Sequence, residues 1–249
     1  MKLGYTFILL LLLCGYKSQQ KPLVREIGIG ILTVNTQYDI PLFKNFDDKT
    51  PIDVLKFNHL KSGKTAFDCK VSLKPYLMYE GDSDEEAKEN IDHGLIRFFP
   101  ELKFIVIEET PDYFRVIVDE DQSSKYYIKK KSEATYYLTA KDFYYNNTSD
   151  RYKPQWYIYE TWERYLKRVE FIELNVIEIY DKPNGKIIFS TEPDGFLSFG
   201  VEKMEGEWIK LKKDMLREFN YPKGINYEGW YRWKKGNVLR IAITEATYE

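Results

Sequence analysis

The chain has 249 residues, of which 43% are hydrophobic, 16% aromatic and 31% charged, and its formal net charge is -2. This apolar and aromatic content excludes a mainly disordered chain, and the balance of 37 Lys and Arg against 39 Asp and Glu argues against a dedicated nucleic-acid binder. With Cys14, Cys69, His59 and His93 as the only cysteines and histidines, a zinc site of four such side chains would need all of them.

An export signal is predicted over residues 1–20. Lys2 is followed by an apolar run from Phe7 to Leu13 and then by polar residues, which is the pattern of a secretory signal. The run is shorter than the roughly 20 apolar residues that a membrane-spanning helix needs. We therefore expect an exported protein of the periplasm or cell envelope.

Cys14 directly follows this apolar run. The stretch Leu-Leu-Leu-Cys14-Gly resembles a bacterial lipobox, in which the Cys receives acyl chains after cleavage, but Leu13 stands where a small residue is usual. Two alternatives stay open. Either Cys14 is lipidated and anchors the protein to a membrane, or cleavage near Ser18 removes it. In the second case Cys69 is a lone thiol, and the core rather than disulfides stabilises the protein.

After the signal, the chain consists mostly of short segments typical of strands. They combine β-branched with aromatic residues, and several alternate apolar with polar positions. The segments are 29–35, 102–107, 113–118, 125–129, 186–190 and 238–244. The pair Asn184-Gly185 tolerates positive φ, so it predicts a tight hairpin turn. The fold class is therefore predicted to be mainly β.

One segment has a helical pattern instead. Apolar residues recur at helical spacing from Tyr159 to Val169, and Thr161 suits an N-cap, so a short amphipathic helix is predicted from about Thr161 to Val169. Residues 140–154 just before it are polar and rich in turn formers, which indicates a linker. We therefore expect a first domain over 21–139 and a second over 155–249.

The two halves show a weak internal repeat. In the second, the segment from Phe199 to Trp208 contains a strand and an acidic turn, and Trp208 opens the next strand; Phe104 to Phe114 has the same shape. A duplication or a common fold would explain this, and a chance similarity between two β meanders is the alternative.

The second half also resembles the bacterial SH3 family. Asp181-Lys-Pro-Asn-Gly-Lys, Gly206-Glu-Trp-Ile-Lys-Leu and Glu228-Gly-Trp-Tyr-Arg-Trp follow one another as the Pro-Gly-type loop, the G-x-W-x-x-V strand and the closing strand do in that family. The match covers 177–233; the loop 212–225 is longer than usual, and 239–249 extends past the expected end. The resemblance implies two small SH3-like β-barrels joined by the linker and the helix, the first one divergent and carrying an acidic insertion at 82–92.

Cys69 is the candidate nucleophile. The pair Asp68-Cys69 resembles the start of cell-wall cysteine peptidases of the NlpC type, but Lys70 follows where that family has Ser-Gly and a helix, and His93 is the only downstream histidine. A thiolate needs a positioned base or a positive environment. We therefore favour a core role for Cys69, and a divergent hydrolase that uses Cys69 or a carboxylate pair is the alternative.

The acidic insertion is the candidate metal site. Asp82, Asp84 and Glu86 alternate as at the start of an EF-hand loop. However, Ala87 replaces the Gly of the sharp turn and His93 replaces the bidentate Glu, so a solvated loop or short helix is the better interpretation. No metal, cofactor or catalytic residue is predicted.

Aromatic residues are the candidate ligand contacts. SH3-like barrels bind extended peptides in aromatic-lined grooves, and neighbouring residues of a strand point to opposite faces. We assign Trp208 and Trp230 to the core, and Tyr180, Tyr231 and Trp233 to ligand contact.

The sequence thus predicts a non-enzymatic, exported binding or interaction module of the bacterial cell envelope. The SH3 resemblance implies peptidoglycan or an envelope protein as partner; no nucleic-acid partner is expected, and a membrane is contacted only through a lipid on Cys14. Besides the hydrolase, a structural lipoprotein without a small ligand is a further alternative.

Overall fold

The computed structural model describes residues 26–59, 65–79, 101–146, 154–191, 197–213, 221, 223 and 227–245. Within them the chain is mainly β, as predicted, with the helices α2 (Ala140–Asn146) and α3 (Trp162–Arg168). None of the helices described there has the length and apolar character needed to cross a membrane. The export signal, Cys14 and the acidic insertion lie outside the described residues, and their assignments stay predictions.

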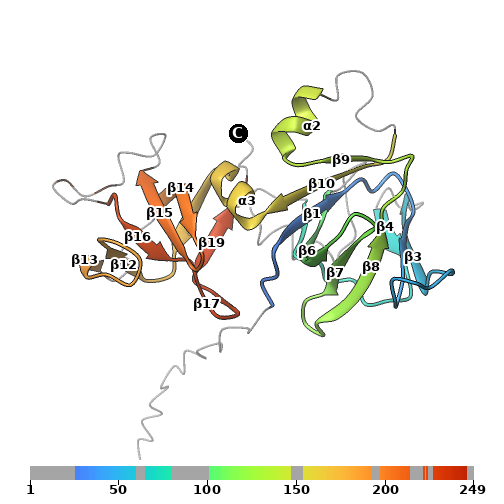
Figure 1. The fold of residues 1–249 in the computed structure, drawn as a ribbon, viewed down its shortest axis with the longest axis horizontal. Coiled ribbons are helices and arrows are strands. Elements are labelled where there is room, and N and C mark those ends of the chain that lie inside the picture. The colour runs from blue at the N-terminus through green and yellow to red at the C-terminus, as the bar shows by residue number, and fades with distance from the viewer. Residues whose placement is uncertain are drawn as a thin grey trace, which may run out of the picture.

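The first half of the chain forms one large sheet (Figure 1). Its strands lie in the order β8-β7-β6-β1-β10-β9, and β5 pairs with the start of β6. The strands are β1 (Gly30–Val34), β5 (Leu77–Tyr79), β6 (Glu101–Glu109), β7 (Tyr113–Asp119), β8 (Ser124–Lys129), β9 (Thr135–Tyr137) and β10 (Trp156–Thr161). A smaller sheet in the order β2-β3-β4 packs against one face; it consists of β2 (Ile40–Leu42), β3 (Asp53–His59) and β4 (Thr65–Asp68).

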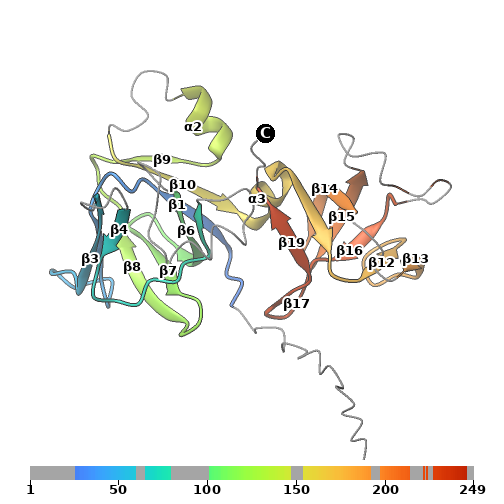
Figure 2. The ribbon, with the colours of Figure 1, turned by 180° about the vertical axis from the view of Figure 1, so that it is seen from behind.

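The second half forms another large sheet, in the order β13-β12-β16-β15-β14-β11-β19. Its strands are β11 (Phe171–Leu174), β12 (Ile177–Tyr180), β13 (Ile187–Thr191), β14 (Ser198–Glu205), β15 (Trp208–Lys213), β16 (Trp230–Arg232) and β19 (Ile241–Thr244). A short hairpin of β17 (Lys234–Lys235) and β18 (Val238–Leu239) precedes β19. Viewed from behind, α3 again lies between the two groups of strands (Figure 2).

The two large sheets share a run of five strands. The order β10-β1-β6-β7-β8 corresponds to β19-β11-β14-β15-β16, the chain visits the strands in the same sequence, and every neighbouring pair is antiparallel. The hairpins β6-β7 and β14-β15 also both contain a register shift. Phe114 and Trp208 each form the pair nearest the hairpin turn, opposite Glu109 and Glu205. The repeat suggested by the sequence therefore coincides with a shared strand order.

The prediction of two closed barrels is not matched. In the described part of the chain, the edge strands of each sheet do not pair with each other, so no sheet closes into a barrel. The second sheet instead ends at β13 on one side and β19 on the other.

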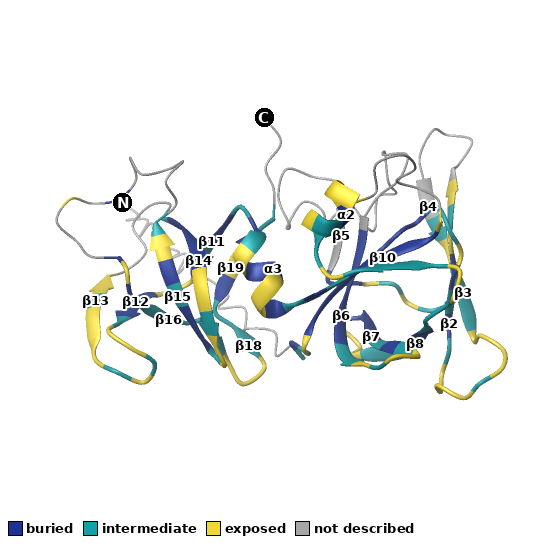
Figure 3. Ribbon diagram, turned by 45° about the horizontal axis from the view of Figure 1, so that its top comes forward, coloured by how far each residue is buried: buried dark blue, intermediate teal, exposed yellow. Residues whose placement is uncertain are grey.

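Alternation along the strands divides the first sheet between two cores. Leu32 and Val34 of β1 point to the face covered by β2 and β3, whereas Ile31 belongs to the core that contains α3 and the second sheet. Ile105 on β6 belongs to the same core as Ile31, and Phe104 belongs to the same core as Leu32. Dark buried stretches run through both sheets in Figure 3. One continuous core therefore joins the two halves.

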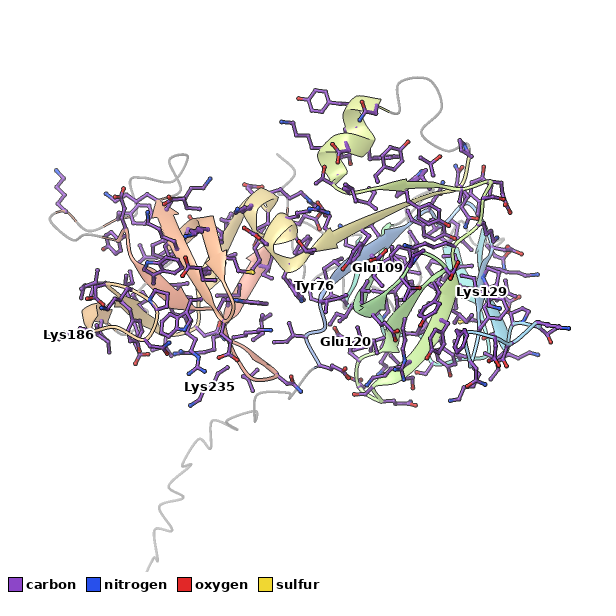
Figure 4. All side chains as sticks on the ribbon, in the orientation of Figure 1. Tyr76, Glu109, Glu120, Lys129, Lys186 and Lys235 are labelled. Atoms are coloured by element: carbon purple, nitrogen blue, oxygen red, sulfur yellow. The ribbon has the colours of Figure 1, made fainter. Side chains whose placement is uncertain are left out.

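Helix α3 is the centre of this shared core, and its prediction is confirmed. Thr161 caps it, since its side chain accepts a hydrogen bond from the backbone N–H of Arg164 at 3.4 Å. Its buried face places the Trp162 ring 5.4 Å from that of Trp233 and 5.9 Å from that of Tyr76. Figure 4 shows Tyr76 beside α3, between the two sheets.

Helix α2 and strand β10 lie at the start and just past the end of the predicted linker 140–154. Helix α2 occupies the start of the predicted linker, because Thr139 accepts a hydrogen bond from the Asp142 N–H at 3.0 Å and Phe143 packs on Trp156 with ring centroids 4.3 Å apart. In addition, β10 pairs with β1, although the boundary assigns it to the second domain. The boundary at 140–154 therefore divides residues that share one sheet.

A buried cluster of four charges lies where the halves meet. Lys103 on β6 contacts the Glu245 carboxylate at 2.5 Å, and Arg168 on α3 bridges Glu245 at 2.5 Å and Glu160 on β10 at 2.6 Å. The Lys103 and Glu160 side chains are each 1% exposed and that of Glu245 is 10% exposed. Two cations thus neutralise two anions away from water.

Candidate functional site

A groove of about 550 Å³ lies on the second half, and we call it the aromatic groove. It is lined by Glu178, Tyr180, Asn184, Gly185, Trp208, Arg232, Lys235 and Arg240. These residues come from β12, the β12-β13 turn, β15, β16 and the chain around the β17-β18 hairpin. Figure 4 shows Lys235 on the lower side of this half and Lys186 at its outer end.

The β12-β13 hairpin supplies one wall of the aromatic groove. Asn184 adopts φ 56° in its turn, and the Asp181 carboxylate accepts a hydrogen bond from the Lys186 N–H at 2.8 Å. Tyr180 pairs with Trp230, which joins β12 to β16. The turn predicted from Asn184-Gly185 is therefore confirmed, and it holds Tyr180 against the neighbouring strands.

Two aromatic side chains form the apolar part of the groove. The Tyr180 ring meets the Trp208 ring edge to face, with centroids 5.0 Å apart and planes at 81°. Trp208 is 7% exposed, and Tyr180 is half-buried. Burial and the neighbouring Glu178 carboxylate raise the pKa of Tyr180, so its hydroxyl stays neutral.

The charged side chains of the groove are mostly cationic. Arg240 contacts Glu178 at 3.3 Å, and Arg232 donates to Glu207 from Nε at 2.9 Å. The hydrogen bond from Arg232 lowers the pKa of Glu207, and the Gly236 N–H adds to this effect. Lys235 is exposed and forms no ion pair within the described ranges. The groove therefore suits a ligand with both an apolar face and a negative group.

The structure separates the three predicted contact residues. Tyr180 lines the groove, whereas Tyr231 is 0% and Trp233 1% exposed, so both lie in the core. The Tyr231 hydroxyl donates to the Arg240 carbonyl at 2.9 Å, and the Trp233 ring N–H donates to Gly206 at 3.0 Å. Of the two residues assigned to the core, Trp208 is buried and Trp230 is half-buried. The faces of β16 are thus opposite to those assigned.

The three cations of the groove were missed by the sequence interpretation. Arg232 follows Tyr231 on β16, so alternation places the two side chains on opposite faces, but it does not indicate which face is buried. Lys235 belongs to β17 and Arg240 follows β18, and no local pattern links them to Tyr180. Their approach depends on the pairing of β12 with β16.

The surroundings of Cys69 are not those of an activated nucleophile. Its side chain is half-buried against the first core, and its thiol is 3.5 Å from the Val71 carbonyl. Burial raises the pKa of the Cys69 thiol, and the carboxylates of Asp53 and Asp68 raise it further. This environment disfavours the thiolate that catalysis requires. The only downstream histidine, His93, lies outside the described residues.

Within the described ranges, no group of three or more His, Cys, Asp or Glu side chains is placed to hold a metal ion. The acidic insertion, where the EF-hand-like spacing occurs, is not among these residues.

Comparisons with known proteins add no relative to this picture. No protein-family model matches the chain, and searches of curated proteins and of solved structures return no match.

Proposed function

We propose that the protein is a non-enzymatic binding module of the bacterial cell envelope, and that its aromatic groove holds an extended ligand carrying a carboxylate, such as a peptide of the cell wall. The observation that carries the proposal is the groove itself, in which the Tyr180–Trp208 pair adjoins Arg232, Lys235 and Arg240. Aromatic rings accept the flat faces of an extended chain at low entropy cost, and the cations attract its negative group.

The strand order supports an SH3-like relationship for both halves. In an SH3-like domain, five antiparallel strands follow one another so that the last pairs with the first, as β19 does with β11 and β10 with β1. In the second half, the segment between the first two of these strands, β11 and β14, contains β12 and its turn, which form one wall of the groove. We propose that the two halves are divergent SH3-like copies fused through α3, rather than separate closed barrels.

Sedimentation with purified peptidoglycan tests the proposed function. The full mature chain is expected to sediment with insoluble peptidoglycan. Lys235→Glu, which reverses an exposed charge in the groove, is expected to lower the apparent affinity about fivefold. Tyr180→Ala removes the aromatic wall and is expected to have the same direction of effect.

A charge change outside the groove is the matched control. Lys167 lies on α3 with a 41% exposed side chain and pairs with Glu163, so Lys167→Gln removes a cation without touching the groove. It is expected to bind as the wild type does. A wild-type chain that stays in the supernatant, or a Lys235→Glu variant that sediments unchanged, contradicts the proposal.

A further inference from the structure

We propose that a second pocket, on the first half, is an oxyanion-binding site that takes a hydrophilic ligand bearing a phosphate or carboxylate group. The pocket has a volume of about 400 Å³ and lies at the β7-β8 hairpin, next to the chain that follows β2. Three of its lining side chains are the cations Lys44, Arg115 and Lys125, and none is a carboxylate. The aromatic groove, by contrast, contains Glu178.

Arg115 is the strongest indication of an anion. Its guanidinium lies over the Tyr127 ring, 5.4 Å from the centroid, and so makes a cation–π contact with it. Its Nε is buried and lacks a hydrogen-bond partner among the described residues. A buried guanidinium N–H without an acceptor is costly, and the Arg115 side chain lines the pocket, where a guanidinium can donate hydrogen bonds to an oxyanion.

The neighbouring groups complete the site. Lys44 is exposed and lies over the Tyr126 ring, 5.8 Å from its centroid, while Lys125 pairs with Glu26 at 2.5 Å and is thereby partly neutralised. Ser123 in the turn between β7 and β8, and Ser124 at the start of β8, add hydroxyl donors. Lys44 and Arg115 are therefore the cations with the most charge to offer a ligand.

Its position in the fold matches that of the aromatic groove. In each half, one wall of the pocket comes from the segment between the first two shared strands. The other wall comes from the third and fourth shared strands, which are β7 and β8 in the first half and β15 and β16 in the second. The oxyanion site has its own set of side chains and does not depend on whether the aromatic groove binds peptidoglycan.

Three sugars that differ only at C6 test the site in the full mature chain: glucose, glucuronate and glucose 6-phosphate. Titrations followed by amide NMR shifts are expected to show that at least one acid perturbs the signals of the β7-β8 turn, and that glucose does not. A response to glucuronate alone assigns a carboxylate ligand, and a response to glucose 6-phosphate alone assigns a phosphate ligand. No response to either acid, or an equal response to glucose, overturns the proposal.

Matched variants locate the response. Arg115→Gln keeps most of the side-chain length and is expected to weaken binding about tenfold, and the exposed Lys44→Gln, which has little reason to misfold, is expected to weaken it in the same direction. Lys167→Gln on α3, outside both pockets, is expected to leave sugar-acid binding unchanged. Unchanged binding in both Arg115→Gln and Lys44→Gln overturns the assignment, and so does a loss confined to Arg232→Gln, which would move the site to the aromatic groove.

Discussion

The two halves of the molecule share five strands but differ in what they insert between the first two. In the second half, the described residues between β11 and β14 form the hairpin β12-β13, and its strand β12 pairs directly with β16. In the first half, β1 and β6 are separated by β2 to β5, of which β2 to β4 form a sheet of their own. The wall of the pocket therefore comes from the loop after β2 in the first half and from the strand β12 and its turn in the second.

This difference explains why two similar positions carry different chemistry. The aromatic groove has its wall on a short, paired strand, so Tyr180 is fixed against Trp208 and the nearby cations Arg232 and Arg240 are held by Glu207 and Glu178. In the first half, the aromatic residue that corresponds to Trp208 is Phe114, which is 1% exposed and belongs to the core. The pocket on that half is instead lined by cations and serines together with Tyr126 and Tyr127, over whose rings Lys44 and Arg115 lie. The shared strands thus form a common framework, and the proposed ligand classes differ with the side chains that line each pocket.

The largest expected effect tests whether Phe114 and Trp208 are equivalent. Phe114→Ala and Trp208→Ala each remove a buried ring beside the turn of corresponding hairpins, so each is expected to lower the free energy of unfolding by about 3–5 kcal/mol. Urea unfolding followed by circular dichroism measures both. Phe46→Ala is the control, since Phe46 is 58% exposed and its loss is expected to cost under about 1 kcal/mol. A large loss at one position and a small one at the other would break the correspondence.

The sequence predicts features that depend on neighbouring residues better than features that depend on residues far apart in the chain. Helix α3 and the β12-β13 turn were predicted well, because a cap at Thr161, helical spacing and Asn184-Gly185 are local features. The pairing of β1 with β10 has no local signal, since the two strands are far apart in the chain. For that reason, the predicted boundary separated β10 from its own sheet.

The candidate site was predicted less well for a related reason. Alternation fixes which residues of β16 share a face but not which face is buried, so Tyr231 and Trp233 could be exchanged with Trp230 and Arg232. The hydrogen bond from the Trp233 ring N–H to Gly206 and its contact with Trp162 decide the matter, and both need the assembled fold.

The next effect tests whether the halves behave as one unit. Glu245, after β19, lies against Lys103 of β6 and Arg168 of α3, and although burial opposes its ionisation, these two cations lower its pKa from 4.5 to about 2. A lowered pKa means that Glu245 contributes stability above about pH 4.5, and that this contribution disappears as the pH falls toward 2. The contribution at neutral pH is on the order of 3 kcal/mol.

Urea unfolding of the wild type and Glu245→Gln over this pH range measures the contribution. The variant is expected to be less stable by about that amount at pH 7, with the gap closing on acidification, because protonation removes the same charge from the wild type. Lys167→Gln, which breaks the exposed pair with Glu163, is expected to cost at most about 0.5 kcal/mol. A gap that does not depend on pH would show that Glu245 does not join the halves through its charge.

The smallest expected effect sharpens the comparison between the turns beside the two pockets. Ser123 in the β7-β8 turn and Asn184 in the β12-β13 turn both have positive φ, at 52° and 56°. Asn adopts this conformation with little strain, whereas Ser does not, so Ser123→Gly is expected to raise the free energy of unfolding by about 0.5 kcal/mol and Asn184→Gly to leave it nearly unchanged. Thermal unfolding of the two variants measures this difference. Ser123 also lines the oxyanion pocket. If Ser123→Gly stabilises the protein but weakens sugar-acid binding, the Ser123 hydroxyl contributes to binding at the cost of a strained turn. Equal effects at the two turns would show instead that the turn at Ser123 stores no more strain than the turn at Asn184.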